Sequence, residues 1–176
     1  FNLVEDNEQN IWIGTNNGLF KYSYKDQQYT RIGYSKDSTK SFNSQDVNSL
    51  YIDTKGIVWV GTWLGGLNKL DPNTGKIKTY TTRDGFNSNT VQGILGDEEN
   101  VALWLSSFDG ISRFDLEKEE FQSFGIDDGI QGNQFAQSSA HKTKDGLFLF
   151  GGQNGVTMFR SQNIKSELVP PEVILT

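Results

Sequence analysis

Few side chains in this 176-residue chain have the types and spacing that catalysis needs. His141 is the only histidine, and the chain has no cysteine, which excludes thiol nucleophiles, thiolate metal sites and disulfides. A nucleophilic triad or a histidine-rich metal site needs partners that no pattern here supplies. We therefore expect His141 to have a structural or surface role, with no catalytic residue, no metal and no cofactor in this segment.

Adjacent carboxylates and one glycine-rich run also invite a chemical interpretation. Asp127-Asp128 and Asp97-Glu-Glu99 place acidic groups side by side, whereas glycoside hydrolysis needs two carboxyl groups about 5 to 10 Å apart across a cleft. We therefore interpret both pairs as solvated turns. The run Gly151-Gly-Gln-Asn-Gly155 joins two strand-like segments, but a phosphate-binding loop would open a helix, so we predict a hairpin.

Two aromatic residues are better candidates for binding. Trp63 and Phe108 lie in expected turns at equivalent places, where an earlier copy of the same turn has Asn16. They could stack on the faces of sugar rings, or pack against a neighbouring sheet, and both interpretations remain open. Arg83 and Asp84 lie in an expected connection and could add polar contacts.

The elements that would position these residues come from an internal repeat. Residues 55–70 read as two short strands joined by a tight turn, and the pattern recurs around residues 10–22, 101–114 and 146–159. The anchor positions are Trp12, Trp59, Trp104 and Leu149, at steps of 47, 45 and 45 residues. A fixed period of this length is typical of repeat architectures.

Each repeat predicts four antiparallel strands, which is the content of one β-propeller blade. In the second repeat we expect strands at residues 48–53, 57–62, 66–70 and 76–81, with turns rich in Asp, Asn and Gly between them. The second strand is apolar on both faces and must be covered on both sides. We expect residues 115–122 to form a turn and an outer strand, since they align with Asp71-Pro-Asn-Thr-Gly-Lys-Ile-Lys78, where Pro and Gly oppose a helix.

The predicted fold is all-β, an open fragment of a larger propeller. Blade boundaries are expected near 1–46, 47–90, 91–134 and 135–169, with 170–176 as a linker and the start of a following immunoglobulin-like domain. The fourth repeat offers only three strands, at 136–141, 146–150 and 156–159. We expect its outermost strand to be missing or replaced by an irregular tail, and the terminal blades to expose apolar faces that promote self-association.

Composition excludes some partners. The formal net charge of −6 argues against nucleic acid or an anionic membrane surface as a partner. No apolar run approaches the roughly 20 residues of a membrane-spanning helix, so we expect no direct membrane insertion in this segment.

The repeat resembles the two-component regulator propeller repeat of bacterial periplasmic sensors. The resemblance is carried by Asp53-Thr-Lys-Gly56, Ile57-Val-Trp-Val-Gly-Thr62, Gly65-Gly-Leu67, Asp71-Pro-Asn-Thr-Gly-Lys76 and Gly85-Phe-Asn-Ser-Asn-Thr-Val91. Residues 133–135, 150–155 and 170–175 resemble the last blade of such propellers and the lead into the immunoglobulin-like domain that follows. The departures are Ala102-Leu103 and Ser106-Ser107 in the third repeat and Leu149 in place of Trp in the fourth.

The resemblance implies a location and a role. Such propellers lie outside the inner membrane, ahead of a transmembrane helix and a histidine kinase or cyclic-dinucleotide domain, and take part in sensing, often of glycan fragments. It implies a periplasmic, non-catalytic sensory segment whose partners are the remaining blades, the immunoglobulin-like domain and an oligosaccharide or other small ligand. Two alternatives remain: a fragment of a propeller lyase or hydrolase, and a scaffold that binds another protein.

Overall fold

The strands of this chain form four separate antiparallel sheets. The computed structural model describes residues 2–33 and 38–164, and its strand content confirms the predicted all-β class. We call the sheets blades 1 to 4 in chain order. Three blades have four strands each and the last has three.

The strand bounds follow the repeat. Blade 1 contains β1 (Asn2–Glu5), β2 (Ile11–Thr15), β3 (Gly18–Ser23) and β4 (Gln28–Ile32). Blade 2 contains β5 (Val47–Ile52), β6 (Val58–Thr62), β7 (Leu67–Leu70) and β8 (Ile77–Tyr80). Blade 3 contains β9 (Val91–Asp97), β10 (Ala102–Ser107), β11 (Ile111–Asp115) and β12 (Glu120–Phe124). Blade 4 contains β13 (Phe135–Lys142), β14 (Phe148–Gly152) and β15 (Gly155–Phe159).

Short 3-10 helices punctuate the connections, and the sequence analysis did not anticipate them. They are η1 (Ser38–Lys40), η2 (Thr82–Asp84), η3 (Ile126–Asp128) and η4 (Ser161–Asn163). Residues 115–122 form a turn and the start of β12, as predicted. The expected domain boundary at residue 170 lies outside the described residues.

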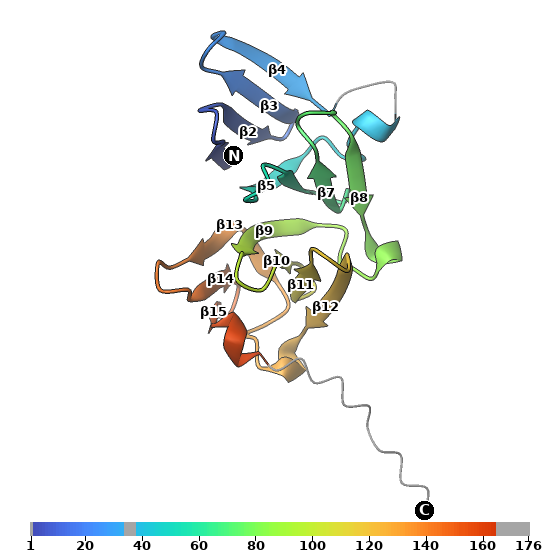
Figure 1. Ribbon diagram of the computed structural model, residues 1–176. Coiled ribbons are helices and arrows are strands. Elements are labelled where there is room, and N and C mark those ends of the chain that lie inside the picture. The colour runs from blue at the N-terminus through green and yellow to red at the C-terminus, as the bar shows by residue number, and fades with distance from the viewer. Residues whose placement is uncertain (1, 34–37, 165–176) are drawn as a thin grey trace, which may run out of the picture.

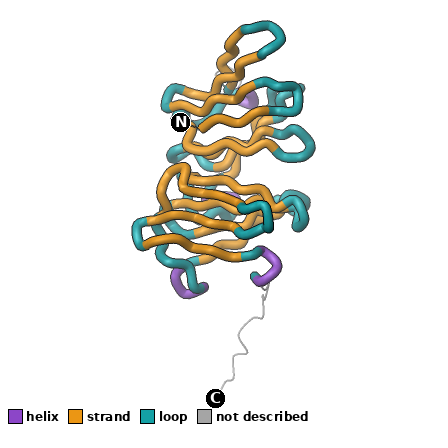
Figure 2. Tube along the Cα trace, turned by 90° about the vertical axis from the view of Figure 1, so that its left-hand side faces the viewer, coloured by secondary structure: helices purple, strands orange, loops and turns teal. Residues whose placement is uncertain are grey.

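The blades are arranged around their first strands. β1, β5, β9 and β13 contact one another in sequence, and in each blade the strands follow in chain order away from them. Figure 1 shows the two N-terminal blades above the two C-terminal ones, and Figure 2 shows successive sheets stacked on one another. This is the arrangement expected of propeller blades.

The chain order within a blade defines two ends of the stack. The turns between second and third strands lie at the same end as the connectors between blades, and we call this end the top face. The turns between first and second strands, and between third and fourth, lie at the bottom face. This division follows from the antiparallel pairing of every blade and decides which side chains can share a site.

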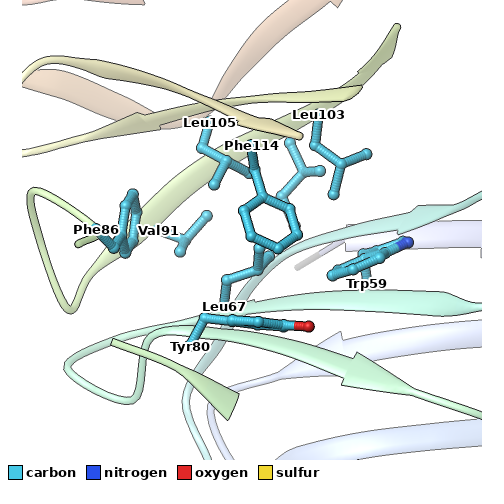
Figure 3. Close-up of a cluster of buried hydrophobic side chains, with 9 residues drawn as sticks. Trp59, Leu67, Tyr80, Phe86, Val91, Leu103, Leu105 and Phe114 are labelled. Atoms are coloured by element: carbon cyan, nitrogen blue, oxygen red, sulfur yellow. The ribbon is translucent and has the colours of Figure 1, made fainter. Parts of the chain in front are cut away.

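Apolar clusters fill the spaces between blades. Between blades 2 and 3, Trp59 and Tyr80 of blade 2 pack on Phe114 of blade 3, with ring centroids 5.7 Å and 4.8 Å from the Phe114 ring (Figure 3). Trp12, Trp59 and Trp104 occupy equivalent positions on β2, β6 and β10, and each is 1% exposed. Burying an apolar side chain of this kind contributes roughly 1.5–3 kcal/mol.

The second strand of blade 2 is covered on both faces, as its sequence predicts. All five residues of β6 are buried, because blade 1 packs on one side of the sheet and blade 3 on the other. A strand with polar residues on one face would leave that inter-blade space unfilled.

Among residues 2–33 and 38–164, nothing covers the outer faces of the two terminal blades, so this part of the chain forms an open arc. On blade 1, Leu3 and Tyr29 are 65% and 68% exposed on the face turned away from blade 2. On blade 4, Val156 and Met158 are 52% and 61% exposed on the face turned away from blade 3. Leu149 lies on that same face and is only half-buried, unlike the tryptophans it replaces.

Candidate ligand-binding face

The turn that carries Trp63 on the top face depends on glycine. Gly66 has a φ of +78°, and a Cβ atom there would lie 2.1 Å from the carbonyl oxygen of Tyr80. Such a contact excludes any residue but glycine without a backbone shift. The hydroxyl of Thr62 closes the turn by donating to the Gly66 carbonyl at 2.9 Å.

Blade 3 builds the same turn around Phe108. Gly110 has a φ of +96°, and its Cβ would lie 2.2 Å from the Phe124 carbonyl oxygen. The hydroxyl of Ser107 donates to the Gly110 carbonyl at 3.2 Å and accepts the N–H of Asp109 at 2.9 Å. The repeated turn therefore holds Trp63 and Phe108 at corresponding places on neighbouring blades.

Backbone hydrogen bonds join each of these turns to the connector of the next blade. The N–H of Gly66 donates to the carbonyl of Asn89 at 2.7 Å, and the N–H of Gly110 donates to that of Asn133 at 2.8 Å. We call these two bonds the top-face links. They fix the turns to the connectors without using any side chain.

The structure brings the two predicted aromatic residues together. The rings of Trp63 and Phe108 lie 5.3 Å apart, centroid to centroid, at 84°, an edge-to-face contact. Each side chain nevertheless remains 41% exposed. Packing against the neighbouring blade and availability to a ligand, the two interpretations that the sequence left open, are therefore compatible.

Leu64 extends this aromatic surface with an unusual backbone. Its φ is +56°, an uncommon value for a residue with a side chain, and its side chain is 70% exposed. The N–H of Leu64 donates to the hydroxyl of Thr90 at 3.1 Å, which fixes the conformation. A strained, exposed apolar residue beside an exposed tryptophan is a pattern found at binding sites.

Carboxamide side chains are frequent on the top face, and the sequence analysis missed them. They come from the top-face turns and the connectors of all four blades: Asn16, Asn17, Asn43, Gln45, Asn87, Asn89, Gln131, Asn133, Gln153 and Asn154. Asn87 is the best fixed, since its amide donates to the Asp109 carbonyl and its oxygen accepts the Ser107 hydroxyl at 3.4 Å. The available signal was the Asn or Gln that follows Phe42, Phe86 and Ile130 in each connector.

Two of these carboxamides are buried without partners. Neither amide atom of Gln131 has a hydrogen-bond partner in the described part of the chain, and neither does the side-chain oxygen of Asn133. An unpaired buried polar group costs about 1–3 kcal/mol unless water or a ligand completes it. Both residues lie in the connector that leads into blade 4.

Arg83 and Asp84 lie on the same top face, in the connector between blades 2 and 3. They belong to η2, and the Asp84 carboxylate accepts the N–H of Thr81 at 2.8 Å, which completes a capping box. The side chain of Arg83 is exposed. The structure thus gives Asp84 a structural task, while His141 is exposed on β13 opposite Leu149.

The bottom face carries charged contacts between blades. Glu119 of blade 3 pairs with Lys69 of blade 2 at 3.1 Å and with Lys78 of the same blade. The hydrogen bond from Lys78 is the main reason that the pKa of Glu119 is lowered to about 2. The carboxylate is therefore ionised at any physiological pH.

A second acidic residue joins three blades. Glu98 of blade 3 accepts the phenol of Tyr51 in blade 2 at 2.7 Å and pairs with Lys142 of blade 4 at 2.6 Å. Burial alone would raise the pKa of Glu98, but the hydrogen bonds from Lys142 and Tyr51 outweigh it and lower the pKa. We call the Glu98 and Glu119 contacts the bottom-face clamps.

Two further features of the described residues are relevant to metal binding and to membrane insertion. Within 2–33 and 38–164, no group of three or more His, Cys, Asp and Glu side chains is arranged to hold a metal ion. Nor does any helix in that part of the chain have the length and apolar character to cross a membrane.

Parts of the repeat are similar to a known family of propeller repeats. The family model described as two component regulator propeller matches residues 1–17 and 41–64. Among curated proteins, the chain is 28% identical to Histidine kinase P4 of Formosa agariphila, over 98% of this chain and 16% of that protein. The predicted resemblance of the repeats is thereby confirmed.

Solved structures confirm the propeller fold. The extracellular domain of a B. thetaiotaomicron protein assigned as a hybrid two component system matches with a TM-score of 0.77 and 22% identity, over 90% of this chain and 22% of that one. A second extracellular domain from B. thetaiotaomicron, assigned as a one component system, gives 0.75 and 22% over the same shares. The chain spans less than a quarter of the length of each of these relatives.

Proposed function

We propose that this chain is a sensory propeller segment of a bacterial signal-transduction receptor, because the family model of the two component regulator propeller matches residues in two of its repeats. In this proposal it lies in the periplasm, as part of an inner-membrane receptor, and contributes to ligand sensing and signal transmission without catalysis. The match of the family model is the observation that carries the proposal. The similarity to a protein named as a histidine kinase, and to two extracellular domains of bacterial signalling proteins, supports it.

The aromatic pair supports an oligosaccharide as the ligand class. Trp63 and Phe108 present exposed rings, which can cover the C–H faces of a sugar. Carboxamides offer both donors and acceptors to hydroxyl groups, and Asn87 is held by two hydrogen bonds beside Phe108. A ligand that reached Gln131 and Asn133 would complete buried groups that lack partners in the described residues.

The distribution of charge favours an uncharged ligand. The two bottom-face clamps hold their carboxylates and ammonium groups on the face opposite to Trp63. The top-face turns and connectors are rich in Asn, Gln, Ser and Gly, but they also carry acidic residues, and Asp109 is exposed directly beside Phe108. An acidic side chain next to the aromatic rings would repel an anionic ligand, so this face suits a neutral oligosaccharide better than an anionic one.

The environment of the carboxylates supports a non-catalytic role. Asp84 caps η2, and Glu98 and Glu119 are paired with lysines on the bottom face. Cleaving a glycosidic bond would need two carboxyl groups facing a shared substrate. The glycan lyase or hydrolase alternative therefore has no specific observation in its favour.

A titration with neutral oligosaccharides tests the proposal. Tryptophan fluorescence and calorimetry of the intact chain should show saturable binding of at least one member of a panel, with no product released. Trp63→Ala and Phe108→Ala should each weaken this binding by about tenfold or more. Tyr24→Ala is the matched control, because Tyr24 is equally aromatic and 67% exposed but lies in a bottom-face turn.

Two outcomes would count against the proposal. Equal loss of affinity in the Trp63→Ala and Tyr24→Ala variants would remove the top face as the site. Release of cleaved product, abolished by changing one carboxylate, would replace sensing with catalysis.

A further inference from the structure

Blade 4 ends its sheet one strand early. Blades 1, 2 and 3 place β4, β8 and β12 outside their third strands, whereas within the described residues no strand pairs with the outer edge of β15. Figure 1 shows β15 last in its sheet, followed by η4 at the lower end of the molecule. An unpaired edge leaves backbone N–H and C=O groups available for another strand.

Two adjoining cavities lie where the missing strand would run. They have volumes of about 470 and 700 Å³, and both are lined by Trp104 and Ile164. The smaller also contacts Phe124 and Phe159, and the larger contacts Arg113. The described residues therefore leave the face of blade 3 that looks toward blade 4 uncovered over its outer strands.

Blade 3 shows what a strand in this position does. β12 turns Phe121 toward blade 2, where its ring lies 6.2 Å from that of Tyr80 and 5.0 Å from that of Phe86. Two residues later on the same face, the hydroxyl of Ser123 lies 3.2 Å from that of Ser112 on the neighbouring strand. One bulky apolar residue and one hydroxyl thus complete the face.

Blade 2 repeats the arrangement toward blade 1. Ile77 of β8 packs against the cluster between blades 1 and 2. Two residues later, the hydroxyl of Thr79 donates to the side-chain oxygen of Asn68 at 2.7 Å. The fourth strand of both blades therefore carries a bulky apolar residue, any residue, and then Ser or Thr.

Blade 4 already presents the groups that such a strand would meet. Thr157 on β15 pairs with Phe150 on β14, just as Ser112 on β11 pairs with Leu105 on β10. Thr157 is therefore the equivalent of Ser112, and its hydroxyl can pair with that of an incoming Ser or Thr. Phe159 stands in the place of Phe114, which packs on Phe121 with ring centroids 4.5 Å apart.

Charge adds a further element to the pattern. In blade 2, Lys69 pairs with Glu119, which precedes Phe121 by two residues. Arg113 in blade 3 is the equivalent of Lys69 in blade 2. It lines the larger cavity and contacts Asp115 at 3.5 Å. An incoming strand with an acidic residue two positions before its bulky apolar residue would bring a carboxylate to Arg113.

We propose that the outer edge of β15 is a docking site for an extended partner segment with the pattern acidic, any, bulky apolar, any, Ser or Thr. The segment pairs antiparallel with β15 through its backbone. Its apolar side chain fills the cavity beside Trp104 and its hydroxyl reaches Thr157. Main-chain pairing supplies affinity and the alternate side chains supply specificity, as in other strand-addition complexes.

A synthetic peptide of residues 118–125, labelled with a fluorophore, is a probe with this pattern. Polarisation measured against the intact chain should show saturable binding. Phe121→Glu within the peptide should weaken binding by about tenfold or more, because it would place a carboxylate against Trp104 and Phe159. Backbone amides of β15 should exchange more slowly with solvent when the peptide is present.

Two protein variants separate docking from general damage. Ile164→Asp places a charge in the cavities and should weaken peptide binding by about tenfold. Val156→Asp is the matched control, because Val156 lies on β15 but its side chain points to the opposite face and lines neither cavity. Its effect should stay within about twofold, and urea unfolding should find both variants folded.

Four results would overturn the proposal. The first three are absence of saturable binding by the intact chain, binding that Phe121→Glu in the peptide leaves unchanged, and equal weakening by Ile164→Asp and Val156→Asp. Binding that begins only after residues 165–176 are removed would also overturn it, since this chain would then be its own occupant.

Discussion

The indole N–H of Trp59 donates to a carboxylate oxygen of Asp53 at 2.9 Å, across the turn that joins β5 to β6. The same bond joins Trp12 to Asp6 at 2.9 Å and Trp104 to Asp97 at 3.1 Å. Each blade with a buried tryptophan thus supplies an acceptor for the one polar atom of that side chain. A buried N–H without an acceptor would otherwise oppose folding.

Removing this acceptor should destabilise the protein. We expect Asp53→Ala to lower the free energy of unfolding by about 1–3 kcal/mol, because the Trp59 N–H and the two turn N–H groups that Asp53 also accepts lose their partner. A double-mutant cycle with Trp59→Phe, followed by urea unfolding, isolates the indole bond. Strict additivity of the two changes would show that the bond contributes nothing.

Truncation to alanine should lower the free energy of unfolding by different amounts at the different anchor positions. Trp59→Ala should lower the free energy of unfolding by about 3–5 kcal/mol, because it leaves a cavity between blades 2 and 3. Leu149→Ala should cost clearly less, since Leu149 is half-buried on an uncovered face. Equal costs in urea unfolding would mean that blade 4 is covered in solution.

Two glycines of positive φ provide a matched pair. Gly66→Ala should destabilise more than Gly75→Ala, because the new Cβ would lie 2.1 Å from the Tyr80 carbonyl oxygen, whereas nothing lies within 4 Å at Gly75. The change at Gly75 should cost only the backbone strain of about 1–2 kcal/mol. Urea midpoints measure both, and similar values would contradict the close approach at Gly66.

Acid should release the Glu119 clamp. Its pKa is about 2 in the folded protein, below the usual 4.5, so the stability it contributes is complete above pH 4.5 and is lost as pH falls toward 2. Glu119 is partly exposed, so we expect a contribution below about 1 kcal/mol. Glu119→Gln should flatten the pH dependence of stability in this window, and Glu117→Gln, a change at an exposed residue of the same turn, should not.

The open arc should associate in solution. The uncovered faces of blade 1, with Leu3, and of blade 4, with Met158, are equivalent to faces that neighbouring blades bury against each other. We expect light scattering at micromolar concentration to show species larger than a monomer, and Leu3→Glu to reduce them. A strictly monodisperse monomer would contradict this expectation.

Much of the fold could be predicted from the repeat. The strands expected at 48–53 and 76–81 are found at Val47–Ile52 and Ile77–Tyr80, because alternation and turn residues are local signals. The sequence also predicted three strands for blade 4, since no strand pattern follows Phe159 at the expected distance, and the described residues hold three strands in that sheet. The short helices were not predicted, because their capping depends on single contacts such as that of Asp84.

The candidate site could be predicted only in part. The contact between Trp63 and Phe108 depends on the offset between two blades, which no local pattern encodes. The carboxamides of the top face were overlooked because each is unremarkable alone and becomes a set only when the strand order assigns its turn to one end of the sheets. Thr143 stands six residues before Leu149, at the position where Asp53 precedes Trp59. The two changes are consistent with each other, because the side chain of leucine has no N–H that needs a carboxylate acceptor.

Blades 2, 3 and 4 are joined by different kinds of bond at their two faces, and this gives that part of the arc a direction of bending. The top-face links are short backbone hydrogen bonds that cannot lengthen without breaking, while the bottom-face clamps end in long, rotatable side chains. These blades should therefore rotate relative to one another about the top face, which acts as the hinge. Such a movement would leave Trp63 and Phe108 in contact while it widens the spaces between the lower edges of the sheets.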